Sequence, residues 1–100
     1  MSDNPALVVL TSLAEGDKYG YLIMRHIETF TQTQMSPRTL HGVIARLKEQ
    51  GWIRPVGPKD LRQVYTITPL GRAHLKRNLS ALQAIAKAGD ARLKHASGNY

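Results

Sequence analysis

Apolar residues recur at helical spacing along most of this chain. Residues 37–50 show the pattern most clearly, because four apolar positions there lie at i, i+3, i+4 and i+7 and share one helix face. These positions are Leu40, Val43, Ile44 and Leu47. Helices are also expected at residues 5–14 and 19–30. The first of these is apolar almost all round, so it needs burial on more than one side.

Three expected helices begin with a small polar residue followed by proline. The pairs are Asn4-Pro5, Ser36-Pro37 and Thr68-Pro69. The polar side chain can cap an otherwise unpaired backbone N–H, and proline at the first helical position has no N–H to satisfy. Gly16 and Gly51 are the expected stop signals of the helices that begin at Pro5 and Pro37.

After Gly51 the apolar period changes to that of strands. Residues 52–56 and 63–67 are rich in β-branched and aromatic residues, and residues 57–62 between them have the composition of a hairpin loop. Pro55 cannot donate a ladder hydrogen bond, which places its strand at an edge. Helices followed by a basic hairpin, the wing, predict a mainly α fold of the winged helix-turn-helix class.

The last helix is expected from residue 69 to about residue 94, with a heptad seam of apolar and small residues. The seam positions are Leu75, Leu79, Leu82, Ala86, Gly89 and Leu93. Such a helix would extend roughly 39 Å, which is longer than so small a domain can cover. A second copy of the chain would bury the remainder. The alternative is a helix folded back on its own domain.

The chain is strongly basic, and its charge is unevenly distributed. Its 14 Lys and Arg against 7 acidic residues give a net charge of +7. Residues 1–35 carry two basic and four acidic groups, residues 36–62 six and two, and residues 63–100 six and one, so the net charges are −2, +4 and +5. The excess favours a polyanionic partner, with nucleic acid ahead of an anionic membrane.

Length and composition limit the kinds of protein that this chain can be. A chain of 100 residues, 42% of them hydrophobic, predicts one folded domain with no room for a separate catalytic domain. The absence of cysteine excludes disulfides and fits a reducing compartment. No basic and apolar leader follows Met1, and no run approaches the ~18 apolar residues of a membrane span. The expected location is the cytoplasm, without membrane contact.

The sequence carries no pattern typical of a catalytic or metal site. Its 4 histidines lie on separate expected elements, without the spacing of a His-Glu-x-x-His or His-x-Glu motif. They are His26, His41, His74 and His95. A glycine loop that would cradle a phosphate is also missing. We therefore expect no enzyme activity, no metal and no cofactor.

Several motifs follow one another in a specific order along nearly the whole chain. The first is an apolar helix ending in a Leu-x-x-Gly type turn, Leu10-Thr11-Ser12-Leu13-Ala14-Glu15-Gly16, and the second contains a Gly-Tyr pair, Lys18-Tyr19-Gly20-Tyr21. The third begins Ser36-Pro37-Arg38-Thr39-Leu40 and continues to Glu49-Gln50-Gly51-Trp52-Ile53. The last is Tyr65-Thr66-Ile67-Thr68-Pro69-Leu70-Gly71-Arg72. In this order they resemble the PadR family of bacterial transcriptional regulators, and the single long C-terminal helix expected here is similar to that of its short subclass.

The resemblance implies a homodimer that binds double-stranded DNA at a pseudo-palindromic operator and acts as a repressor. It also implies either a small aromatic or drug-like effector near the dimer interface, or control by protein abundance alone. Two positions depart from the family pattern, because His41 replaces a usual Tyr and Trp52 a usual Leu. His41 would alter a DNA contact or make it sensitive to pH, and Trp52 would fill the core beneath the wing or stack on a ligand.

The expected organisation is a DNA-binding domain at residues 1–68, a dimerisation helix at residues 69–95 and a disordered tail at residues 96–100. The dimer interface is expected to combine the C-terminal seam with two leucines of the first helix. Its predicted residues are Leu7, Leu10, Leu75, Leu79, Leu82, Ala86 and Leu93.

The residues expected to bind DNA lie on the second and third helices and on the hairpin. They are Tyr19, Tyr21, Ser36, Arg38, Thr39, His41, Arg46, Lys48, Lys59 and Arg62. In a major groove, Arg38 could donate to guanine, while Thr39 or His41 could contact base edges or phosphate. Ser36 is first a helix cap and only second a phosphate ligand.

For four of the DNA-binding candidates, a purely structural role is a comparable alternative. Tyr19 and Tyr21 would offer hydroxyls to the DNA backbone or be partly buried, and Arg46 and Lys48 would contact phosphate or remain solvated. The wing residues Lys59 and Arg62 would follow the DNA backbone or minor groove, as the resemblance implies. The rival functions are a winged-helix scaffold that binds protein and a nonspecific DNA-binding protein. RNA binding is a less favoured alternative function, because the sequence shows no exposed aromatic platform on which bases could stack.

Overall fold

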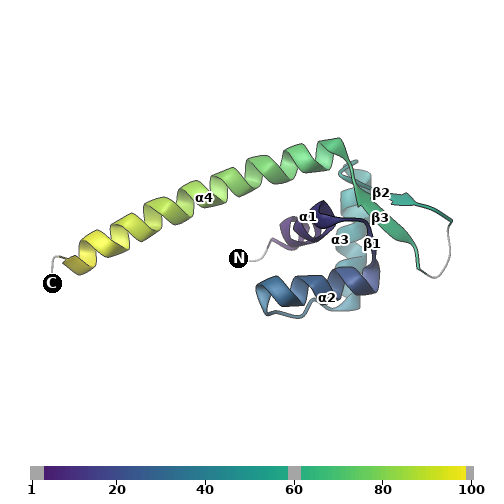
Figure 1. Ribbon diagram of the computed structural model, residues 1–100, viewed down its shortest axis with the longest axis horizontal. Helices are drawn as coiled ribbons and strands as arrows, with labels where there is room; N and C mark the ends of the chain where they lie inside the picture. Colours follow the sequence, from purple (N-terminus) through teal and green to yellow (C-terminus); the bar gives the residue numbers. More distant parts are fainter. Residues whose placement is uncertain (1–3, 59–61, 99–100) are drawn as a thin grey trace.

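The computed structural model describes residues 4–58 and 62–98, and these form helices around a small sheet, with one helix projecting from the rest (Figure 1). In chain order the elements are α1 (Pro5–Glu15), β1 (Lys18–Tyr19), α2 (Gly20–Thr31), α3 (Pro37–Glu49), β2 (Ile53–Val56), β3 (Val64–Ile67) and α4 (Pro69–Gly98). The first three helices and both hairpin strands begin and end within one residue of the expected bounds. The winged helix-turn-helix prediction is confirmed.

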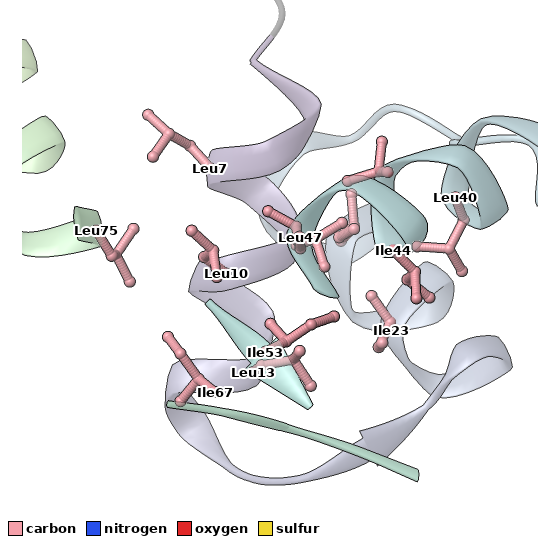
Figure 2. Close-up of a cluster of buried hydrophobic side chains, with 13 residues drawn as sticks. Leu7, Leu10, Leu13, Ile23, Leu40, Ile44, Leu47, Ile53, Ile67 and Leu75 are labelled. Carbon is pink, nitrogen blue, oxygen red and sulfur yellow. The ribbon is translucent and has the colours of Figure 1, made fainter. Parts of the chain in front are cut away.

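α1 lies at the centre of the core, as its all-round apolar sequence predicts. Val9, Leu10 and Leu13 have no exposed surface, and α1 contacts α2, α3, α4 and β3. Figure 2 shows the leucines of α1 beside buried side chains from the other elements, among them Leu47 of α3 and Leu75 of α4. One central helix therefore fixes the positions of the elements around it.

The amphipathic pattern and the start signal of α3 are both confirmed. Its four periodic apolar residues are buried, and the Ser36 Oγ accepts a 3.1 Å hydrogen bond from the Thr39 N–H. Thr68 caps α4 in the same way, by accepting from the Gly71 N–H at 3.0 Å. The expected cap at Asn4 is wrong for the side chain, since only its carbonyl oxygen accepts from α1. α3 is followed by Gly51 at φ +77°, a left-handed conformation that favours glycine.

The sheet contains a strand that the sequence pattern does not predict. The strand order is β1-β3-β2, with antiparallel pairs throughout. β1 places Lys18 opposite Tyr65 and Tyr19 opposite Val64. Two residues are too few to show an alternating pattern, so only pairing with β3 reveals this strand. β2 is an edge strand, as Pro55 predicts.

α4 leaves the other elements after its first turns. Leu75 is buried in the core, whereas every residue from Leu79 to His95 is exposed, and the longest dimension of the molecule is 60 Å. The helix therefore does not fold back on its own domain. It continues to Gly98, so the disorder expected from residue 96 is wrong for residues 96–98, while residues 99–100 lie outside the described part. Within the described chain, no helix combines the length and apolar character needed to cross a membrane.

The buried leucines correct part of the predicted dimer interface. Leu7, Leu10 and Leu75 are 5%, 0% and 6% exposed, because the start of α4 packs directly against α1. These three residues therefore belong to the core of the protomer rather than to its surface. The other predicted interface residues, Leu79, Leu82, Ala86 and Leu93, are exposed along α4.

Candidate nucleic-acid interface

The outward face of α3 combines basic and hydroxyl side chains with small ones. Arg38, Thr39 and Arg46 are exposed, and Gly42 and Ala45 lie between them on the helix surface. A Cβ atom added at Gly42 would meet nothing within 4 Å, so this part of the surface is open. A helix with small residues at the centre of its exposed face can approach another surface closely.

The N-terminus of α3 is held by two hydroxyl groups. The Ser36 Oγ accepts from the backbone N–H of Thr39 and donates to the Thr39 Oγ1 at 3.0 Å. Ser36 therefore has the capping role predicted for it. Because the Thr39 Oγ1 accepts from Ser36, its own hydrogen is directed to acceptors outside this pair.

A groove of about 360 Å³ lies between α3, the start of α2 and the hairpin. It brings together four predicted DNA-binding residues from separate segments of the chain, Tyr19, Tyr21, His41 and Arg62. The described side chains that line it include the charged Arg62 and the polar groups of Tyr19, Tyr21 and His41. Such a groove suits an anionic backbone better than a cation.

Tyr19 and Arg62 form one wall of this groove. β1 pairs with β3 and so holds Tyr19 beside the hairpin, and the Arg62 guanidinium carbon lies 5.4 Å from the centre of the Tyr19 ring. At this distance a cation–π attraction orients the arginine. Lys59, predicted at the wing tip, lies outside the described residues.

Gln63, which is not among the predicted DNA-binding residues, holds the neck of the hairpin. Its Nε2 donates to the Val56 carbonyl at 3.0 Å and to its neighbour Val64 at 3.3 Å. Gln63 and Tyr65 both line the groove. The alternation of residues 63–67 could have placed Gln63 and Tyr65 on one face of their strand.

Tyr21 is positioned by Arg25, which is also absent from the predicted DNA-binding residues. The Arg25 Nη1 donates to the Tyr21 hydroxyl at 3.1 Å, and its guanidinium carbon lies 5.9 Å from the ring centre. The hydrogen bond to Tyr21, with a smaller contribution from Glu28, raises the pKa of Arg25 above its ordinary value. The i, i+4 spacing of Tyr21 and Arg25 on one helix was the available signal.

Arg46 and Lys48 are not part of the groove. Both lie in the last turn of α3, where basic side chains interact favourably with the helix dipole. They are exposed. The structure therefore separates them from the four residues that line the groove.

The sequence profile of the transcriptional regulator PadR-like family matches residues 9–77, which include α2, α3 and the hairpin. This chain belongs to that family. The regulator is 30% identical to a transcriptional regulator from Clostridium thermocellum, with 84% of each chain covered and a TM-score of 0.74. The resemblance recognised from the motifs is therefore confirmed.

Two further relatives show how far the likeness extends. A PadR family regulator from hypervirulent Clostridium difficile shares the fold at a TM-score of 0.80, over 89% of this chain and 97% of its own, with 18% identity. An uncharacterised 37.1 kDa protein of transposon TN4556 from Streptomyces fradiae is 29% identical over 85 residues. The regulator spans 25% of the length of that relative. Membership of the PadR-like family places the chain among transcriptional regulators.

Proposed function

We propose that the regulator is a homodimeric repressor that places α3 in the major groove of a pseudo-palindromic operator. The observation that carries the proposal is the groove beside α3, which Tyr19, Tyr21, His41 and Arg62 line together. DNA backbone lying in this groove would bring the outward face of α3 against the bases. Recognition helices commonly enter the major groove with their N-terminal residues nearest the base edges.

The N-terminal residues of α3 would read sequence. Arg38 is exposed on the first turn and can donate to guanine O6 and N7. The Thr39 hydroxyl can donate to a base or phosphate acceptor, because Ser36 already fixes its orientation. His41 lies between the reading face and the groove, so it can contact a base edge or the adjacent backbone.

The groove residues would bind phosphates and set the register of the protein on the duplex. The Tyr19 and Tyr21 hydroxyls and the Arg62 guanidinium can each donate to a phosphate oxygen. Near the ends of α3, Ser36, Arg46 and Lys48 would contact phosphates of the same DNA strand. Lys59 would contact this strand from the wing tip. Contacts of this kind add affinity for every sequence and make binding depend on salt.

Dimerisation would use the exposed seam of α4. Leu79, Leu82 and Leu93 are 38%, 48% and 71% exposed and share this seam with Ala86. Two such helices packed together would exclude the leucines from water. We accordingly assign DNA binding to residues 1–68 and dimerisation to residues 69–95. The two α3 helices would then face successive major grooves, about 34–36 Å apart.

Repression would follow from occupation of the operator, and release from a small aromatic ligand bound between the two α4 helices beside the exposed leucines. A ligand that prefers one arrangement of the two helices can shift the dimer away from the DNA-binding arrangement. Displacement of a labelled operator by aromatic compounds, measured by fluorescence anisotropy, tests this part. Absence of displacement across the panel would favour control by protein abundance.

The main test is selection from a random duplex pool, followed by anisotropy titration of the selected duplex and a scrambled duplex at two salt concentrations. We expect a two-fold-symmetric sequence bound at least ~10³-fold more tightly than the scrambled control. Weak binding that ignores sequence would support a nonspecific DNA-binding protein instead. Binding to neither duplex would support a scaffold for protein partners.

A further inference from the structure

The end of α3, the start of the wing and the start of α4 are joined at one point, which we call the junction (residues 51, 52, 68, 71 and 74). The Trp52 N–H donates to the Leu47 carbonyl of α3, and the Trp52 carbonyl accepts from the Thr68 N–H, both at 3.0 Å. The Thr68 hydroxyl donates to the Gly51 carbonyl at 2.6 Å. Backbone hydrogen bonds therefore connect the recognition helix to the first residue before α4.

Glycine at position 71 allows the first turn of α4 to lie directly on the backbone of Trp52. A Cβ atom at Gly71 would overlap the carbonyl group of Trp52. Because the neighbour is backbone rather than a flexible side chain, it cannot move aside without shifting the start of the wing. The two backbones are thus in contact, and Gly71 is buried.

Trp52 and His74 extend the junction from backbone to side chains. Their rings are stacked, with centres 3.7 Å apart and planes inclined by 13°. Trp52 is partly buried and also packs against the core. On the next turn of α4, the Asn78 Nδ2 donates to the His74 carbonyl at 2.8 Å. The stack lies just before the part of α4 that is exposed from Leu79 onward.

A long helix amplifies any change at its base. Residues 75 to 93 of α4 extend roughly 27 Å at 1.5 Å per residue, so a tilt of about 10° at the junction would move the far end by about 5 Å. The far end carries the exposed leucines proposed to meet the second copy. The angle at the junction therefore determines where the partner's recognition helix lies.

We propose that the stack of Trp52 on His74 is a positioning device that fixes the angle between α3 and α4, and thereby the spacing of DNA half-sites that the dimer accepts. This inference rests on the proposed function. Neither ring lines the DNA-binding groove, so the pair acts through the relative placement of two helices. The attraction between two aromatic rings depends on their mutual geometry, so a change in the angle between the two helices would weaken this stack.

The test compares duplexes that carry two copies of the selected half-site, with the spacer shortened or lengthened by one or two base pairs. Each added base pair moves a half-site by about 3.4 Å and rotates it by about one tenth of a turn. The variants are Trp52→Leu and His74→Ala, which remove the stack, and Trp52→Phe and His74→Phe, which retain two stacked rings. Lys76→Ala, on the exposed side of the same helix turn, is the matched control.

We expect the wild-type dimer to prefer one spacer. Trp52→Leu and His74→Ala should reduce the preference for that spacer by about two- to tenfold, the range that an aromatic pair contributes. Affinity for a single half-site should stay within about twofold, and both phenylalanine variants should keep the wild-type preference. The double variant Trp52→Leu/His74→Ala should lose no more than either single variant, as expected for two residues that act as one contact.

Other outcomes separate the inference from the function on which it rests. If both stack-removing variants keep the wild-type spacer preference, or lose affinity equally for half-sites and full sites, the stack only fills the core and the inference is wrong. If Trp52→Leu alone shows a lower thermal midpoint together with weaker half-site binding, the fold of that variant is destabilised. In that case His74→Ala decides the test, because the His74 side chain lies outside the buried core. If the wild-type protein shows no spacer preference at all, the proposed dimeric function fails as well.

Discussion

Leu75 and Leu82 lie seven residues apart on the same seam of α4, yet Leu75 is 6% exposed and Leu82 is 48% exposed. Leu75 belongs to the same buried cluster as Leu7 and Leu10 of α1, while every residue of α4 from Leu79 to His95 is exposed. Figure 1 shows the C-terminal part of α4 projecting away from the other elements. The described chain thus has two regions, a body (residues 4–78) with its own core and an arm (residues 79–95) without one. A heptad pattern predicts an apolar face but not which surface covers it.

The two regions draw their stability from different sources. In the body, α1 buries apolar side chains on several sides. The arm is rich in Ala and Leu, which favour a helix locally, but helices without tertiary packing are only marginally stable in water. The helical content of the arm should therefore depend on protein concentration, because a second copy would have to cover it. The structure of the body should not depend on concentration.

The largest effect should come from a leucine of the body. Leu10→Ala is expected to lower the free energy of unfolding by about 2–5 kcal/mol, because it leaves a cavity at the centre of the core. Urea denaturation followed by tryptophan fluorescence measures this, since Trp52 packs against the core. Leu93→Ala is the matched control in the arm, and equal losses for the two variants would contradict the division into body and arm.

A leucine of the arm should instead change association. Leu82→Ala removes a side chain whose exposed half would be buried in both copies, so the dimer dissociation constant should rise about ten- to a hundredfold. Sedimentation equilibrium measures the constant, and unfolding of the dilute protein measures the body separately. An unchanged dissociation constant would show that the dimer uses another surface. Thr29→Ala, on α2, is an exposed control outside the arm.

The comparison also shows how much of the fold was predictable from sequence. Periodicity and the Asn-Pro, Ser-Pro and Thr-Pro start signals predicted α1, α3 and the start of α4, because these depend on local geometry and one continuous apolar face. β1 was not predicted, since a two-residue strand exists only through its pairing with β3. The burial of Leu75 was missed for a similar reason, because residues distant in sequence determine it.

The candidate site was predictable in its parts but not in its assembly. Residue type and motif resemblance selected Tyr19, Tyr21, His41 and Arg62, and the structure places all four around one groove. The support that Arg25 gives to Tyr21 depends on which rotamers the fold allows. The stack of Trp52 on His74 joins two elements through tertiary packing, and no spacing rule predicts it.

Within the body, a base-reading residue should affect one duplex more than others. Arg38→Ala is expected to weaken binding to the selected operator by about 1–3 kcal/mol and to relax one base position, without changing the dimer dissociation constant. Anisotropy titrations on the operator and its single-base variants measure the loss. Lys76→Ala, exposed at the start of α4, serves as the charge-matched control. Equal losses on all duplexes would instead place Arg38 on phosphate.

The smallest effect should come from Arg62, whose guanidinium is already oriented by the Tyr19 ring. Arg62→Ala is expected to weaken the operator and a scrambled duplex equally, and to reduce the slope of log affinity against log salt by about 0.9, the value for one phosphate contact. Titrations at four salt concentrations on both duplexes measure the slope. Tyr19→Phe should leave the slope unchanged, because it removes a neutral hydroxyl but keeps the ring that orients Arg62. If the loss of affinity is confined to the operator, Arg62 contacts a base edge rather than the DNA backbone. The groove would then take part in sequence recognition together with α3.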